Sequence, residues 1–256
     1  MKTKNKHEEF YFDKTGKNIP FNELVEYIKT DKTYSYYRNS MYCAECRKPK
    51  LNLTQPIDRA PYLSKQKFDP HDRNCILEVE PITRKVAEKH FNSIDDKEIE
   101  SLISQILIKE LKKTEDAKNK QNNLVVSKNV DDPRIIKTKA SKSVQKKRLP
   151  YKLLTNDLSY KVNGDSIYVF HGRVKLQVEN KISVKNPKFT FNILHISVKK
   201  YGSWLRVARV YRKQIIDNVD PNKEYYIALI GSLNQKYAKD IELVNEKMSA
   251  IEFVEI

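Results

Sequence analysis

The chain has 256 residues, of which 39% are hydrophobic and 32% charged, and its formal net charge is +16. A charge this large favours polyanionic partners, with nucleic acid ahead of an anionic membrane surface, although lysine is common throughout the chain. The 5 glycines leave no Gly-rich phosphate loop of the Walker or dinucleotide type. With no apolar run of about 18 residues and no signal peptide, we expect a cytoplasmic protein and no membrane partner.

The first thirty residues predict a small mixed α/β module. Residues 9–12 are typical of a short strand, and residues 13–16 form a turn signal. A helix is expected over 20–28, because Phe21, Leu24 and Ile28 then share one helical face.

All three cysteines lie in one short window, as Cys43-x2-Cys46 followed by the pair His71-x3-Cys75. Two thiols in a tight turn can bind one side of an ion, and the second pair can complete a tetrahedron. Three thiolates and an imidazole suit zinc, and four protein ligands make a closed, structural site. We therefore predict a structural zinc ion as the cofactor. Three buried free cysteines and a surface histidine are the alternative, and a disulfide is disfavoured because nothing else indicates secretion.

Between the two ligand pairs the pattern predicts a β-hairpin. Residues 51–53 alternate like a strand, and residues 60–64 can be its partner. Asp69-Pro70 disfavours a helix just before His71. A turn holding two ligands, a short hairpin and a second ligand pair together predict a zinc-ribbon-like module.

This stretch resembles the N-terminal zinc ribbon of CoiA-like competence proteins over residues 10–92. The resemblance rests on Tyr42 with the first ligand pair, on Pro61-Tyr62-Leu63, on the second ligand pair, and on a helix carrying Glu80 and His90. In that family the ribbon precedes a restriction-endonuclease-like domain. The resemblance therefore implies a nuclease domain downstream of the metal site.

Two helices are expected after the metal site, over 81–91 and over 95–111. Ser93 and Asp95 are typical helix caps. The second helix carries an apolar stripe at helical spacing, which predicts either a packing face or a face for a homodimer or protein partner across 99–111. The stripe comprises Ile99, Leu102, Ile103, Ile106, Leu107 and Leu111.

Residues 112–150 are rich in lysine and poor in apolar residues, which predicts a basic, flexible linker. Its basic end can hold phosphates without sequence preference, and a solvated linker without contacts is the alternative. The cations concerned are Lys137, Lys139, Lys142, Lys146, Lys147 and Arg148.

From residue 151 onward the pattern is that of strands. They are expected at 167–178, 189–198, 204–216, 224–233 and 250–254, with a less regular segment at 241–244, and residues 199–204 form a hairpin turn. These lengths predict a small closed barrel of the OB type, with a β-sandwich or an SH3-like barrel as alternatives. The predicted fold class is α+β: a zinc-ribbon-like domain at 1–111, the linker at 112–150 and an OB-like β-barrel domain at 151–256.

An OB-like barrel binds single strands through a cationic groove and aromatic side chains that stack on bases. Trp204 is the only tryptophan and lies beside a lysine-rich hairpin, although it can equally cap the barrel core. Of Tyr225 and Tyr226, alternation predicts that one is exposed. The expected nucleic-acid contacts are Arg173, Lys175, Lys199, Lys200, Tyr201, Trp204, Arg206 and Arg212.

The sequence thus favours a non-catalytic, zinc-containing protein that binds nucleic acid, with single-stranded DNA or RNA preferred. A protein-interaction adaptor or dimerising module is the first alternative. The second is a magnesium-dependent, restriction-like nuclease, because Asp165 and the Glu179-Asn180-Lys181 run follow the order of an Asp…Glu-x-Lys site.

Overall fold

The computed structural model describes residues 7–31, 34–58, 60–118, 132–140, 143–156, 158, 160, 164–237 and 239–256. The chain divides into two compact units. The first contains Met1–Glu80 and Lys112–Ile135, and the second contains Pro81–Leu111 and Ile136–Ile256. Residues 81–111, which the sequence grouped with the metal module, therefore cluster with the barrel.

The first unit contains a small antiparallel sheet with the strand order β2-β1-β3. On β1, Phe10 and Phe12 alternate toward the core and are fully buried, as expected for a strand with one solvent-facing side. The helix α1 begins directly after β2 and adds Leu24 to the same core. The strand and helix predicted for this region are confirmed as β1 (Glu9–Phe12) and α1 (Phe21–Asp31). The strands β2 (Lys17–Pro20) and β3 (Met41–Cys43) were not predicted.

The hairpin expected between the ligand pairs is also present. Strands β4 (Leu51–Thr54) and β5 (Tyr62–Lys65) are antiparallel, with Leu53 opposite Leu63. Their leucines join the core beneath β1, which fixes the hairpin to the sheet. A 3-10 turn, η1 (Ile76–Glu78), follows the second ligand pair.

The second unit begins with the helices α2 (Arg84–Ser93) and α3 (Asp96–Lys118), of which α3 continues past the unit boundary. The N-terminus of α3 is closed by a capping box: Glu98 N donates to Asp95 Oδ1 at 2.8 Å, and Asp95 N donates to Glu98 Oε2 at 3.1 Å. Ile99, Ile103 and Ile106 are buried in the same core as the barrel strands. Packing within this unit therefore accounts for much of the apolar stripe.

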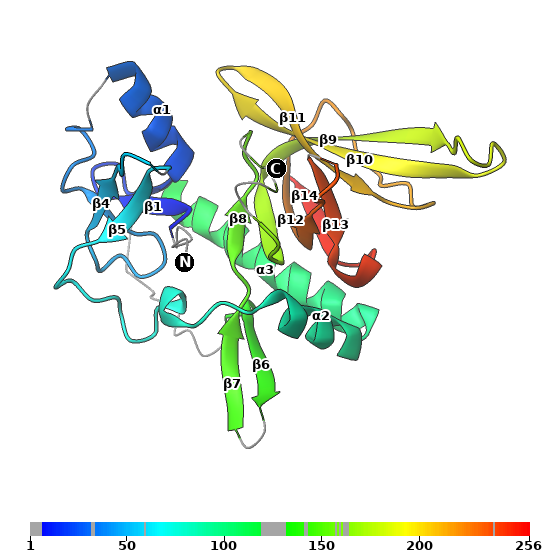
Figure 1. Cartoon of the computed structure of the whole chain (residues 1–256). Coiled ribbons are helices and arrows are strands. Elements are labelled where there is room, and N and C mark those ends of the chain that lie inside the picture. The colour runs from blue at the N-terminus through cyan, green and yellow to red at the C-terminus, as the bar shows by residue number, and fades with distance from the viewer. Residues whose placement is uncertain are drawn as a thin grey trace. The chain divides into compact units, whose positions relative to one another are not determined.

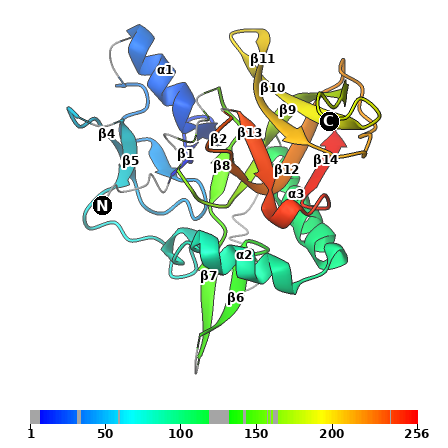
Figure 2. The same cartoon turned by 45° about the vertical axis from the view of Figure 1, so that its right-hand side comes forward.

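Part of the expected linker is a β-hairpin. Strands β6 (Ile135–Ala140) and β7 (Ser143–Arg148) form a two-stranded sheet. Both views show this hairpin projecting past α2, away from the barrel strands (Figures 1 and 2). Residues 119–131 of the expected linker lie outside the described residues.

The remaining strands form a closed five-stranded β-barrel. Hydrogen-bonded pairs run from β9 through β10, β11, β13 and β12 and return to β9, while β8 pairs with β9 and β14 with β12. β11 and β13 are parallel, and the other four pairs of the ring are antiparallel. The strands are β8 (Tyr151–Leu153), β9 (Tyr168–Ile182), β10 (Thr190–Lys200), β11 (Ser203–Tyr211), β12 (Tyr225–Leu233), β13 (Asp240–Leu243) and β14 (Ile251–Glu255).

The predicted strands are confirmed, but the prediction for the tyrosine pair on β12 is wrong. Tyr225 and Tyr226 are only 5% and 7% exposed, because both faces of β12 are buried. A near-continuous apolar run is the pattern of a strand covered on both sides, and here it overrides simple alternation. Each hydroxyl has a polar partner: Asp220 N donates to Tyr225 Oη, and Tyr226 Oη lies 3.0 Å from His171 Nδ1.

Candidate metal centre and candidate nucleic-acid interface

Cys43, Cys46, His71 and Cys75 converge on one point, with all four ligand atoms within 4.8 Å of one another. Cys43 Sγ lies 4.0 Å from Cys75 Sγ, and Cys46 Sγ lies 3.5 Å from His71 Nδ1. A tetrahedral ion with metal–sulfur bonds of about 2.3 Å requires sulfur atoms about 3.8 Å apart. The cluster can therefore hold a metal ion with little rearrangement.

The first ligand pair is positioned by a tight turn at the end of β3. Arg47 N donates to Cys43 O at 2.8 Å, and Cys43 N donates to Pro49 O at 3.0 Å. Arg47 has φ 55°, in the left-handed region, where the chain reverses direction. The turn folds the chain back so that both thiols face the same point.

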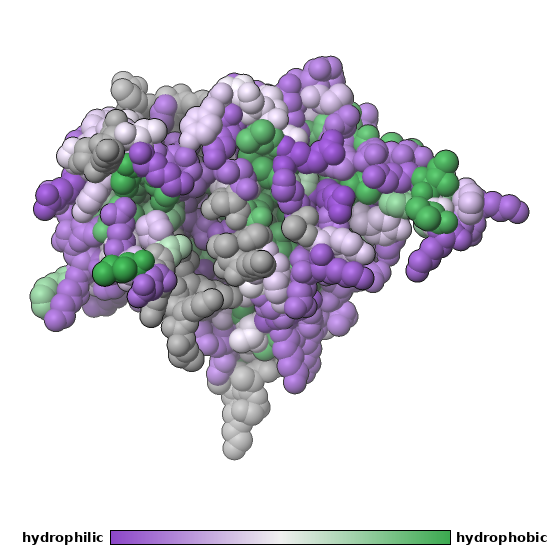
Figure 3. Space-filling view, turned by 45° about the horizontal axis from the view of Figure 1, so that its top comes forward, coloured by the Kyte–Doolittle hydropathy of each residue, from purple (hydrophilic) through white to green (hydrophobic). Residues whose placement is uncertain are grey.

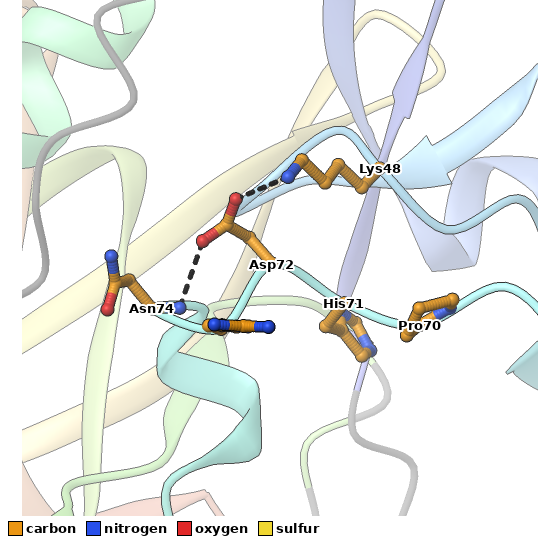
Figure 4. A pocket seen from close by; sticks show the side chains of 6 residues that line it. Lys48, Pro70, His71, Asp72 and Asn74 are labelled. Carbon is orange, nitrogen blue, oxygen red and sulfur yellow. Dashed lines mark hydrogen bonds and ion pairs between the residues drawn. The ribbon is translucent and has the colours of Figure 1, made fainter.

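The second ligand pair lies on a loop ordered by Asp72. Its carboxylate accepts a hydrogen bond from Asn74 N at 2.9 Å and pairs with Lys48 Nζ at 2.6 Å, and both contacts are drawn in Figure 4. Lys48 follows the first ligand pair in sequence, so this ion pair joins the two ligand segments. The hydrogen bond from Lys48 holds the pKa of Asp72 below its usual range.

The pKa values of the three thiols are shifted in different directions. Hydrogen bonds from Cys43 and then Cys75 lower the pKa of Cys46, whereas hydrogen bonding to Cys46 and Cys75 and burial raise the pKa of Cys43. The pKa of Cys75 is raised to about 12, because the hydrogen bond to Cys46 and burial outweigh the lowering effect of Cys43. The three thiols thus differ in acidity, and binding a cation would release thiol protons.

The ligands are enclosed by apolar and aromatic neighbours. Cys43, Cys46 and Cys75 form a buried cluster with Ile76 and Leu77, against which Ile135 packs. The ring of His71 stacks on that of His7, with centroids 5.6 Å apart. Glu78 Oε1 lies 3.8 Å from His71 Nε2, on the side of the ring away from the thiols. A closed shell of this kind is characteristic of a structural site.

A buried arginine binds to the turn between the first two cysteines. Arg134 is 2% exposed, and its two Nη atoms donate to the Glu45 carboxylate at 2.9 Å each. Its Nε and Nη2 donate to Asp132 at 3.0 and 2.7 Å. Lys113 Nζ lies 3.4 Å from the same Glu45. The sequence analysis missed this network, because nearly ninety residues separate Glu45 from Arg134 and neither belongs to a motif.

The barrel brings together a second set of candidate residues. Across the sheet β9-β10-β11, Lys175 lies opposite Ser197, Ser197 opposite Arg206, and Lys199 opposite Trp204. Residues directly opposite one another share a face, so these side chains point outward together. Lys175 Nζ lies 5.4 Å from the centre of the Trp204 ring, within range of a cation–π contact. Trp204 is half-buried and does not belong to the barrel core cluster.

The lysine-rich turn lies at the end of this face. Tyr201 and Gly202 form a two-residue turn between β10 and β11, with φ values of 48° and 81° that are typical of a type I′ hairpin. Tyr201 is 77% exposed, and Lys200 Nζ lies 5.1 Å from its ring centre. Arg173, on β9 two residues before Lys175, forms an ion pair with Glu224.

Arg212 differs from the other candidate cations. It is 5% exposed, its guanidinium binds Asp217 with its closest contact at 2.9 Å, and its Nη1 donates to Met248 O at 2.8 Å. Its charge is therefore neutralised inside the barrel unit. The structure places it among structural ion pairs rather than on the exposed face.

The same outer face carries aromatic residues that the sequence analysis did not select. Tyr211 is 45% exposed, and its ring lies 5.3 Å from that of Phe191, which in turn lies 6.4 Å from that of Phe189. Beyond them, Ile182 and Val184 are 64% and 101% exposed on the β9–β10 hairpin. At the right of Figure 3, hydrophobic surface precedes a hydrophilic tip. The alternation of residues along β10 and β11 was the sequence signal that could have placed these aromatic residues on the outer face.

The three residues considered for a nuclease are not gathered in one place. Glu179 pairs with His195 Nε2 at 2.6 Å and with Lys181 Nζ at 3.4 Å near the far end of β9. Asp165 precedes the start of β9 and forms an ion pair with Arg84. Glu179 lies eleven residues after Tyr168 along β9, about 36 Å of strand at about 3.3 Å per residue.

Comparisons with protein-family models, with curated proteins and with solved structures find no match to this chain. Among the described residues, no helix is both long and apolar enough to cross a membrane. The function of this chain must therefore be inferred from the geometry of the two candidate sites.

Proposed function

We propose that this chain is a nucleic-acid-binding protein that carries a structural zinc ion and binds single strands on the outer face of its barrel. One observation carries the proposal: the β9-β10-β11 face places Lys175, Arg206 and the half-buried Trp204 side by side. Cations and an aromatic side chain together on one face of a sheet are the groups that single-strand binders use to hold phosphates and stack bases.

The choice of zinc rests on the chemistry of the ligands. Three thiolates and one imidazole form a soft, four-coordinate set, which favours zinc over calcium, magnesium or manganese. The turn, the β4–β5 hairpin and the second ligand pair follow the plan of a zinc ribbon. Four protein ligands would leave a bound ion no open position for a water or substrate, so its role would be to hold the first unit together.

The assignment of the barrel to the OB type rests on its topology. The barrel has five strands, and its long first strand, β9, pairs with both β10 and β12. The ring therefore runs β9-β10-β11-β13-β12 and closes back on β9. OB-folds are five-stranded Greek-key barrels that bind oligonucleotides across the face of their second and third strands. Here those strands are β10 and β11, which carry Lys199, Trp204 and Arg206.

A salt-titrated binding experiment with Trp204→Ala tests the proposal. Because stacking on one aromatic ring contributes about 1–3 kcal/mol per base, we expect the affinity for a single-stranded oligonucleotide to fall about 5- to 150-fold. In the native chain the only tryptophan should be quenched on binding, which gives a direct signal from this face. Phe68→Ala, at an 89% exposed site in the first unit, is the matched control.

Two outcomes would contradict the proposal. One is an unchanged affinity of the Trp204→Ala protein for single strands. The other is an affinity of the native chain that does not vary with salt, because phosphate contacts release counterions and must weaken as salt increases.

A further inference from the structure

The hairpin of β6 and β7 is the most uniformly cationic element of the chain. From Ile135 to Asn156 the sequence contains no acidic residue. Among the side chains that the structure describes there, Lys137, Gln145 and Lys146 are exposed, and Val144 is 63% exposed. Lys139 and Lys147 lie on the same two strands. We call the two strands the basic arm.

The basic arm is held at its base by the core of the second unit. Ile136, at the start of β6, is 3% exposed, and Leu149, just after β7, is 1% exposed; both belong to the barrel core cluster. Ile82 N donates to Arg148 O at 2.9 Å, which ties the end of β7 to the segment before α2. Within the hairpin, Thr138 Oγ1 donates to Gln145 O at 3.3 Å.

An isolated two-stranded hairpin is only marginally stable, and like charges on paired strands destabilise it further. The two strands contain no acidic residue of their own, so an anionic partner would reduce the repulsion between their cations. Its shape limits which partner fits: two strands of six residues form a narrow ribbon about 20 Å long.

We propose that the basic arm binds duplex DNA, as a site separate from the single-strand face of the barrel. The major groove of B-form DNA is about 12 Å wide and admits a two-stranded β-ribbon, with phosphates along both edges. The deep, narrow major groove of A-form RNA does not admit side chains in this way. The arm has too little apolar surface to insert into a lipid bilayer, since Val144 is its one strongly exposed hydrophobic residue among those described.

The test compares the full chain with Lys137→Gln/Lys146→Gln in binding to a 30-base-pair DNA duplex, to the same sequence as duplex RNA and to one of its single strands. Lys89→Gln/Lys97→Gln, at exposed positions on α2 and α3, removes the same charge and is the matched control. The arm variant should lose about tenfold or more in affinity for duplex DNA. The negative slope of log affinity against log salt should also become shallower by about 1.8, because each of the two lost phosphate contacts contributes about 0.9.

Equal affinities and slopes for the arm and control variants on duplex DNA would overturn the proposal. So would an equal loss on single strands, which would make the arm a general source of charge, or a loss confined to duplex RNA. The proposal is independent of the barrel face: Trp204→Ala should weaken single-strand binding and leave duplex binding unchanged. Failure of either site is therefore visible while the other is intact.

Discussion

The two units of this protein are stabilised in different ways. Among the described residues, the barrel unit has one core cluster of 35 buried hydrophobic residues, whereas the largest core cluster of the first unit has 7. The first unit supplements its small core with the four-ligand cluster and with the ion pairs of Arg134. Small cores commonly need a metal or a disulfide to stay folded, so an ion bound at the cluster would add most to the unit whose core is smaller.

The largest expected effect is that of removing the proposed zinc ion from the four-ligand cluster. Structural zinc contributes about 10–16 kcal/mol of apparent binding free energy in small domains, so a strong chelator should unfold the first unit. The barrel should remain folded, because its core contains none of the ligands. Fluorescence of Trp204 reports the barrel alone, and hydrogen exchange of β1 and β3 reports the first unit. Loss of protection in both units together would show that their stabilities are not separate.

A smaller effect is expected from Arg134→Met, which would leave the partly buried Glu45 and the buried Asp132 without their main cation. Breaking a buried ion pair by removing one partner costs about 3–5 kcal/mol. We expect the lower end, because Glu45 is partly exposed and also pairs with Lys113. Chemical unfolding of the metal-loaded protein measures the change. Lys29→Met, whose ion pair on α1 is exposed, is the control and should change stability by less than about 0.5 kcal/mol.

The smallest effect concerns pH and the barrel. The hydrogen bond from His195, together with Lys181, holds the pKa of Glu179 below its ordinary value of 4.5. The carboxylate therefore stabilises the fold above that pH, and this contribution is lost as the pH falls through the lowered pKa of the folded state. Glu179→Gln should flatten the dependence of barrel unfolding on pH below about 4.5. An unchanged pH profile in the variant would show that the pair is not coupled to folding.

Most local elements followed from residue patterns. Helices formed where apolar residues recur at helical spacing, as in α3, and strands formed where they alternate, as in β9 and β10. The ligand pairs were readable because the chemistry of metal binding restricts both residue type and spacing. The two-residue turn at Tyr201-Gly202 was readable because only certain residues tolerate its backbone angles.

Tertiary structure decided what lies next to what. Sequence pattern could not show that β9 pairs with both β10 and β12, that helices α2 and α3 share the barrel core, or that Arg134 returns to the turn at Glu45. Nor could it separate Arg212, neutralised by Asp217, from Arg206 on the open face. The physical reason is that local patterns are set by neighbours within a few residues. Burial and charge pairing depend on contacts between distant segments, which exist only once the chain has folded.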